Sequence, residues 1–342
     1  MTLTVLIVAV VVMALAFDYV NGWNDSANAI ATVIATRVLS PTAAVTLAAV
    51  LNLVGAMVGV EVADTMSKII HTSTEFFPQR ETVLVVVIAG LTSAAIWAAA
   101  MTVLGMPISG SHSLIGGVVG AGVAAAGVEV LVVPNVTKTL VAMLLAPTIG
   151  FAFAYLFYVA LIWLTIRMKP TTMNQVFGKA QVVSASWMAF THGSNDAQKV
   201  MGIITMALVA GGFQKPLESG KFAVELWVQL ACAGAISLGT AIGGWKVIRT
   251  LGHHLTKLGP PEGFAAETSA SIVLSLAAWL GIPTSTTHTI TGTILGLGAT
   301  RGMSSVRWGL GEKIVLAWVF TLPICAAVGG ATYWVLKIFT GY

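Results

Sequence analysis

Apolar runs of about 20 residues recur from one end of the chain to the other, and each is long enough to cross a bilayer core of about 30 Å. Within lipid, every backbone N–H and C=O group needs a partner inside the protein, so helices are the spanning element that this pattern predicts. Only 9% of the 342 residues are charged, whereas soluble domains carry about 25%. We therefore expect an all-α integral membrane protein embedded in a lipid bilayer.

The charged and sulfur-containing residues exclude several kinds of partner. The formal charge is +4, but the basic residues are scattered in short loops, as membrane topology requires, so no nucleic acid partner is expected. Cys232 and Cys325 both lie in apolar segments, which favours neither a disulfide framework nor a metal site. No Lys or Arg precedes the apolar run 1–16, and we interpret this run as a retained first helix. No cofactor is expected.

Two motifs occur twice in the chain, in the same order. The segment NGWND at 21–25 recurs as HGSND at 192–196, which is 171 residues later. The segment GMPISGSHS at 105–113 recurs as GIPTSTTHT at 281–289, which is 176 residues later. Two motifs at nearly the same spacing indicate an internal duplication of the whole chain.

The duplication divides the chain into an N-terminal half at 1–168, a cytoplasmic linker at 169–183 and a C-terminal half at 184–342. An odd number of crossings in the first half starts the second half on the opposite side, so we predict two inverted-topology repeats. In this scheme ten loop Lys and Arg residues fall on one side and six on the other, which favours the first side as cytoplasmic. We therefore predict a multi-pass protein of the plasma membrane, the inner membrane of a bacterium, with both termini outside.

Each copy of the longer motif predicts a re-entrant helical hairpin. Pro107 and Pro283 end the preceding helix, because proline lacks a donor and clashes with the previous turn. The hydroxyl-rich residues that follow open a half-helix whose free N–H groups and dipole favour an anion near the bilayer midplane. The arms are expected to pack closely at glycines, namely Gly116, Gly120, Gly292 and Gly296. The predicted phosphate-binding residues of the two hairpins are Ser109, Gly110, Ser111, Ser285, Thr286 and Thr287.

The shorter motif supplies carboxylates, which suit a cation or a proton and not an anion. A carboxylate inside a membrane segment is costly and usually serves an ion or proton pathway. Asp25 and Asp196 each follow an asparagine, Asn24 or Asn195, with a glycine close by. Hard cations favour oxygen ligands, and unwound backbone carbonyls near the glycine would complete the shell of a small cation. The two aspartates would bind a metal only if a metal ion is the coupling ion, and the alternative is that they cap broken helices.

The two halves differ beyond these motifs. Lys199 places a positive charge where the first half has Asn28, and it would pair with the neighbouring carboxylate, attract the anion or occupy a cation site. A fixed ammonium repels a metal ion, so Lys199 favours H⁺ over Na⁺ as the coupling ion. Glu267 is another candidate for carrying a proton, and the alternative is an exposed glutamate at a helix start. His112 and His288 are interpreted as structural donors, with proton transfer as the alternative.

At these residues the chain resembles the inorganic phosphate transporter (PiT) family. The resemblance rests on residues 22–29 and 193–199 and on both hairpin motifs, and it covers the whole chain in family order. It implies symport of phosphate with a cation, through an inverted-repeat bundle that forms a homodimer. It also implies that both Asn-Asp motifs and both hairpins form one shared site, in which Asn24 and Asn195 join the phosphate ligands. Cation or proton coupling is assigned to Asp25, Asn28, Asp196, Gln198, Lys199 and Glu267.

The residue pair Gln198-Lys199 is similar to the bacterial branch of this family, which is associated with proton-coupled, low-affinity uptake that includes metal–phosphate complexes. We therefore predict a secondary active symporter that takes up inorganic phosphate by alternating access. The physical reason for symport is charge compensation, because a bare anion in a low-dielectric site is prohibitively costly. A sulfate or related oxyanion permease of the same fold and an anion channel are the alternatives. No enzyme is expected, because the sequence shows no Ser/His/Asp nucleophile arrangement.

Overall fold

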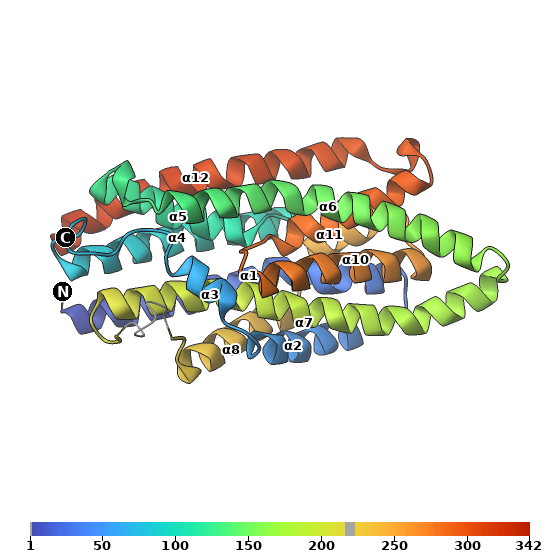
Figure 1. Ribbon diagram of the computed structural model, residues 1–342, viewed down its shortest axis with the longest axis horizontal. Helices are drawn as coiled ribbons and strands as arrows, with labels where there is room; N and C mark the ends of the chain where they lie inside the picture. Colours follow the sequence, from blue (N-terminus) through green and yellow to red (C-terminus); the bar gives the residue numbers. More distant parts are fainter. Residues whose placement is uncertain (1, 216–222) are drawn as a thin grey trace.

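The computed structural model describes residues 2–215 and 223–342, and nearly all of them are helical, which confirms the all-α prediction. The helices lie side by side along one long axis (Figure 1). They are α1 (Leu3–Ala35), α2 (Pro41–Ala56), α3 (Glu61–Met66), α4 (Arg80–Leu104), α5 (Gly110–Ala126), α6 (Val133–Thr165), α7 (Pro170–Ala210), α8 (Leu226–Ile242), α9 (Trp245–Arg249), α10 (Pro260–Trp279), α11 (Thr286–Thr300) and α12 (Trp308–Thr340). Three short elements complete the fold, η1 (Val128–Val130), η2 (Thr250–His254) and η3 (Met303–Ser305).

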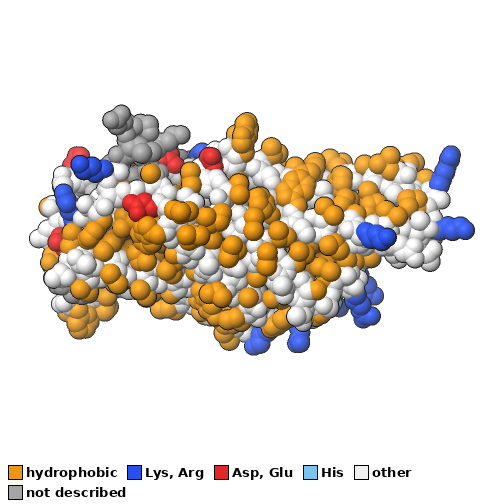
Figure 2. Space-filling model, turned by 90° about the horizontal axis from the view of Figure 1, so that it is seen from below, with side chains coloured by type: hydrophobic (Ala, Val, Ile, Leu, Met, Phe, Trp, Pro, Cys, Tyr) orange, Lys and Arg blue, Asp and Glu red, His pale blue; other side chains and the backbone are white. Residues whose placement is uncertain are grey.

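The outer surface of the bundle is apolar, as a bilayer requires. Among the described residues, α1, α4, α6 and α12 are long and apolar enough to cross a membrane, and α8 with α9 and η2 forms a further candidate span bent by 63°. Leu144 and Leu164 on α6 are largely exposed, which is expected of side chains that face lipid. Figure 2 shows hydrophobic side chains over the middle of one face, with Lys and Arg gathered mainly at the end away from the chain termini. The chain is a multi-pass membrane protein.

The packing of the helices repeats between the two halves. Helix α1 packs against α8, and the corresponding helix of the second half, α7, packs against α2. In the same way α5 packs against α12, and α11 packs against α6. Figure 1 shows α1 running away from the end that carries the N-terminus and α7 running back toward it. This antiparallel course is the one that inverted repeats require.

The structure has no break where the linker ends. Residues 170–183 form the first part of α7, a single helix of 41 residues that continues through the predicted start of the second half. Pro170 occupies the first turn of this helix, where its missing N–H has no intrahelical partner to lose. The predicted boundary at residue 184 therefore lies inside a helix.

The expectation that the backbone unwinds at the Asn-Asp motifs is wrong. Helix α1 runs unbroken from Leu3 to Ala35, and α7 is equally continuous through its own motif. The motif glycines instead allow two backbones to touch. A Cβ atom on Gly22 would lie 2.3 Å from the carbonyl oxygen of Ile236, and one on Gly193 would lie 2.2 Å from that of Asn52. Close helix packing, and not backbone flexibility, explains the glycines.

The glycines of the hairpins have a different partner from the predicted one. A Cβ on Gly120 would lie 2.0 Å from the carbonyl oxygen of Ala326 in α12, and one on Gly296 would lie 2.3 Å from that of Phe151 in α6. These contacts join each hairpin to the long helix of the other half and do not join the two arms of one hairpin. Residues four apart lie on one face of a helix, and the face that holds these glycines is turned away from the first arm.

We expect Gly120→Ala to destabilise the fold. The added methyl group would overlap backbone atoms of α12, which cannot rotate away, and overpacking of this kind costs about 1–3 kcal/mol. The melting temperature in detergent should fall. Gly234→Ala on α8 is the matched control, because no described atom outside its own stretch of helix lies within 4 Å of its added Cβ, and the loss of a helical glycine should leave stability unchanged or raise it. Equal melting temperatures for both variants would contradict the close contact of α5 with α12.

Candidate functional site

Two turns, one in each half, build the tips of the hairpins. Helix α4 is followed by Gly105 in the left-handed conformation with φ 74°, and Ser109 then caps α5 by accepting a hydrogen bond from the backbone N–H three residues later. In the second half Gly281 has φ 60°, and Ser285 caps α11 in the same way. The two prolines lie in the short non-helical stretches between each of these glycines and the serine that follows it. The predicted helix break and the new half-helix behind it are therefore confirmed in both hairpins.

The two hairpin tips touch each other in the interior. The hydroxyl of Ser111 donates a hydrogen bond to the carbonyl oxygen of Thr284, at 3.3 Å. The carbonyl oxygen of each left-handed glycine also accepts a hydrogen bond from a threonine hydroxyl of the opposite half. Thr250 donates at 2.8 Å in the first hairpin, and Thr65 donates at 2.7 Å in the second. Figure 1 shows the α4–α5 hairpin in the half of the bundle near the termini and α10–α11 in the other half. Two half-helix N-termini therefore converge from opposite ends.

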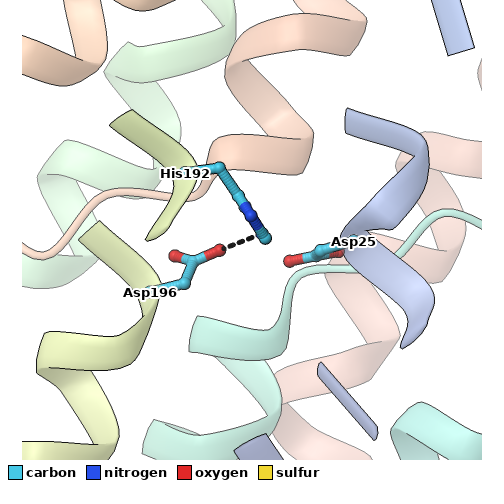
Figure 3. Close-up of side chains that lie close together, drawn as sticks. All are labelled: Asp25, His192 and Asp196. Atoms are coloured by element: carbon cyan, nitrogen blue, oxygen red, sulfur yellow. Dashed lines mark ion pairs between the residues drawn. The ribbon is translucent and has the colours of Figure 1, made fainter. Parts of the chain in front are cut away.

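A cluster of two carboxylates and an imidazole lies beside these tips. Asp25 comes from α1, and His192 and Asp196 come from α7, so the two halves of the chain both contribute (Figure 3). The Nε2 atom of His192 lies 3.1 Å from Oδ2 of Asp196, and all three side chains are almost completely buried. One ligand atom from each of the three residues lies within 4.8 Å of the others, which is close enough for a cation to bridge them.

Hydroxyl and amide groups tie the second hairpin to both carboxylates. Thr287 donates to Oδ1 of Asp25 at 2.9 Å, and Thr286 donates to Oδ2 of Asp196 at 2.8 Å. The amide of Asn28 donates to the hydroxyl of Thr287 at 3.0 Å. Each carboxylate thus has a neutral donor from the same helix N-terminus, so a movement of this hairpin would break hydrogen bonds to both acids.

Lys199 ties the first hairpin to the same cluster. Its ammonium contacts the carboxylate of Asp196, donates to the hydroxyl of Ser111 at 2.6 Å and donates to the carbonyl oxygen of Thr284 at 2.6 Å. Lys199 and Asn28 occupy equivalent positions in the two repeats, and each donates to the second residue of a hairpin helix. The structure therefore repeats one interaction in both halves, with a charged donor in one half and a neutral donor in the other.

The motif asparagines flank the cluster, with their side-chain nitrogens already occupied. Asn24 donates to Thr102 at 2.8 Å, and Asn195 donates to the backbone of Thr191 at 2.8 Å. The buried Oδ1 atoms of Asn24, Asn28 and Asn195 accept no hydrogen bond from the described residues. Buried acceptors of this kind usually serve a ligand or water.

Two predicted coupling residues lie outside this cluster. Gln198 accepts a hydrogen bond from the backbone N–H of Val62 at 2.9 Å and donates to the carbonyl of Val58 at 3.3 Å, so it holds the connection between α2 and α3. Glu267 is fully buried on α10, where it accepts hydrogen bonds from Thr32, Gln181 and Ser184 at 2.5, 3.1 and 2.5 Å. The alternative of an exposed glutamate at a helix start is therefore wrong.

The two hairpin histidines face a separate, apolar cavity. Their ring centres lie 4.5 Å apart, and the ring of His288 stacks on Trp318 at 3.9 Å. The Nδ1 atom of His288 lies 3.4 Å from the carbonyl oxygen of Met143, which agrees with the interpretation as a structural donor. The cavity has a volume of about 670 Å³ and is lined largely by apolar side chains of α6 and α12. His288 thus joins the second hairpin to these helices, and His112 packs against its ring.

Two buried polar residues near the site have no assigned role in the sequence interpretation. His192 opens the second copy of the shorter motif, and its position four residues before Asp196 was the available signal, because such residues share a helix face. Its other ring nitrogen lies 3.0 Å from Oδ1 of Asn52. Asp18 is a carboxylate inside the first apolar run, and an acid in a membrane segment was itself the signal.

Comparison with known proteins agrees with this architecture. Residues 21–329 match the model of the phosphate transporter family (PHO4). The chain is 44% identical over 329 residues to a "Probable low-affinity inorganic phosphate transporter" of Rhizobium meliloti (strain 1021), with 96% of each chain covered. It is 40% identical over 338 residues to a protein of the same name from Bacillus subtilis (strain 168), with 98% of each covered. A solved structure titled "The sodium-dependent phosphate transporter" has the same fold, with a TM-score of 0.85 at 24% identity over 98% of this chain and 99% of that one.

Proposed function

Because this chain belongs to the phosphate transporter family, we propose that it is a secondary active symporter, which takes up inorganic phosphate together with a proton by alternating access. Phosphate is the substrate of the family, and the relatives are named as transporters, so the chain is a transporter and not an enzyme. The coupling ion and the transport cycle are the parts that we add.

The meeting of both hairpin tips with both motif carboxylates is the observation that carries this proposal. Ser111 belongs to the first hairpin and Thr286 to the second, and the pair of Lys199 with Asp196 joins them. A phosphate bound at this point would have helix N-termini on two sides and an ammonium beside it. It would also have carboxylate and amide oxygens to accept the hydrogen bonds of a protonated phosphate, which sulfate at neutral pH cannot donate.

The charges in the cluster favour a proton over a sodium ion. Lys199 already contacts Asp196, so a metal ion held between the aspartates and His192 would have a fixed positive charge as its neighbour. A proton needs a single acceptor atom and no shell of ligands, so it tolerates this neighbour better than a metal ion does. The 24% identity to the sodium-dependent transporter carries the fold to this chain and does not carry its ion.

The burial of the cluster is the reason for alternating access. Asp25, Asp196 and Lys199 are each at most 3% exposed, so this conformation is closed to both ends of the bundle. Phosphate can enter or leave only if helices move, and the hairpins are the mobile elements that we propose. Breaking the contacts of one tip would open one end, and a loaded or an empty site would permit the change.

Reconstituted vesicles test the coupling ion directly. An inward proton gradient should drive accumulation of labelled phosphate, and a proton ionophore should lower the accumulation at least about 10-fold, the size of a typical coupling energy between linked sites. Replacing sodium with choline should have no effect, and excess sulfate should not compete. Uptake that needs sodium and ignores the ionophore would overturn proton coupling. Inhibition by sulfate would favour the alternative of a general oxyanion permease.

The placement in the cell and the subunit number follow as separate proposals. We propose that the end rich in Lys and Arg faces the cytoplasm of a bacterial inner membrane, with both termini outside. We also propose a homodimer, and metal–phosphate complexes as further substrates. Labelling of a cysteine added near residue 342 in intact cells would check the orientation, and light scattering in detergent would check the subunit number.

A further inference from the structure

Asp18 on α1 is a buried aspartate whose carboxylate receives no hydrogen bond from an oxygen or nitrogen atom of the described residues. It is 0% exposed, and neither carboxylate oxygen has a hydrogen-bond partner among the described residues. The group that approaches it is the thiol of Cys232 on α8, a weak donor. The charged groups whose fields reach Asp18 are Asp196 and Lys199, both on α7, and they form an ion pair with each other.

An ionised carboxylate in this environment would be very costly. Removing such an ion from water costs several kcal/mol even after the protein relaxes, and hydrogen bonds or a partner charge must compensate for it. Glu267 shows the contrast, because it is also 0% exposed but accepts hydrogen bonds from three side chains. The described residues offer Asp18 no comparable donors. Its charge must therefore be cancelled by a small cation, and the smallest is a proton on the carboxyl group itself.

The position of Asp18 links it to the transport site. It precedes Asp25 by seven residues, which places it two turns, or about 10 Å, nearer the end of α1 that carries the N-terminus. Asn21 lies between them on the same side of the helix, and its buried Oδ1 atom also lacks a hydrogen-bond partner within residues 2–215 and 223–342. This oxygen lies against the tip of the first hairpin, because a Cβ on Gly110 would come within 1.7 Å of it. The equivalent position in the second half is Ala189, so the acid occurs in one half only.

We propose that Asp18 is the residue that binds the coupling proton, from the side of the membrane that the N-terminus faces. The inference rests on the proposed proton symport. The carboxylate of Asp18 takes up one proton while the outward path is open and gives it up after the conformational change. The added positive charge offsets one negative charge of phosphate, so a monovalent phosphate and its proton cross together without net charge. Asn21, beside the first hairpin, is the amide that would sense whether the proton is present.

Asp18→Asn separates proton coupling from phosphate movement. Asparagine copies the shape and the charge of the neutral acid but cannot release a proton. Exchange of labelled phosphate across vesicles, with equal concentrations and equal pH on both sides, should stay within about 2-fold of wild type. Accumulation driven by an inward proton gradient should fall at least about 10-fold, the size expected when a linked site is uncoupled. Asp18→Glu, which restores a carboxyl group, should recover part of the accumulation.

Each other outcome counts against the inference. Full accumulation by Asp18→Asn would show that the proton binds elsewhere, while proton-driven uptake by the wild type would still support the proposed function. Loss of both exchange and accumulation would make Asp18 a residue of the phosphate site. Failure of Asp18→Asn to fold would show that the native group is charged, since asparagine copies the neutral form. A wild type driven only by sodium would refute the proposed coupling and this inference together.

Discussion

Asp196→Asn is expected to lower phosphate uptake at least about 100-fold, because removing one partner of a buried ion pair costs about 3–5 kcal/mol. Asp196 joins three side chains from two elements, namely Lys199, His192 and Thr286. The neutral amide would keep the shape but leave the ammonium of Lys199 buried without its counter-charge. Both hairpins contact this carboxylate or its lysine, so the loss would disturb the two tips at the same time.

Uptake into vesicles measures this effect, with Glu312→Gln as the matched control. Glu312 is an exposed acid on α12, and its replacement removes the same charge at a distance from the cluster. A size-exclusion profile and a melting curve in detergent would show that Asp196→Asn is folded. Asp25→Asn should behave in the same way, because Asp25 accepts a hydrogen bond from the same hairpin. Normal uptake by both aspartate variants would remove these carboxylates from the mechanism.

Lys199→Met is the second substitution for which we expect a loss of at least about 100-fold in uptake, because it also breaks a buried ion pair. Methionine fills a similar volume to the lysine stem, so packing should change little. The change removes the ammonium from Asp196 and the hydrogen bonds to Ser111 and Thr284, which join the two hairpins. It also removes the positive charge nearest to the proposed phosphate position. Both the affinity for phosphate and the rate of its uptake should therefore fall.

The response of phosphate uptake to added sodium tests whether Lys199 also selects the coupling ion. If Lys199 excludes a metal ion from the carboxylates, Lys199→Asn, which copies Asn28 of the first half, should show uptake that rises when sodium is added. Wild type should show no such rise. Lys313→Met, which removes an exposed positive charge on α12, is the control for net charge. Wild-type uptake by Lys199→Met would exclude the lysine from phosphate binding and from the choice of ion.

The hairpins illustrate how local rules can be read from a sequence. A proline ends a helix and a serine caps the next one through atoms that lie within a few residues, so Pro107 and Ser109 predict their own turn. The hydrophobic runs likewise predict spans, because span length depends on the bilayer and not on other helices. The same locality explains the failure at the Asn-Asp motifs. The sequence predicts an unwound backbone near Gly22, but this glycine packs against Ile236, which lies in another helix.

Which side chains meet in the site depends on contacts between residues far apart in the sequence. Thr287 and Asp25, which form one hydrogen bond, are 262 residues apart, and no spacing rule predicts which hydroxyl reaches which acid. The positions of Gln198 and Glu267 outside the carboxylate cluster have the same reason, since each is held by donors and acceptors from other helices.

The sequence alone determined the membrane class, the duplication and the two hairpins with their hydroxyl-rich tips, because these follow from composition and from interactions along one stretch of chain. Only the tertiary structure decided that Lys199 joins both hairpins, that His192 belongs to the carboxylate cluster and that buried Asp18 has no oxygen or nitrogen donor in the described parts of the chain. The physical reason is that the charge state of a buried group depends on every element packed around it, and packing between helices is a property of the whole fold.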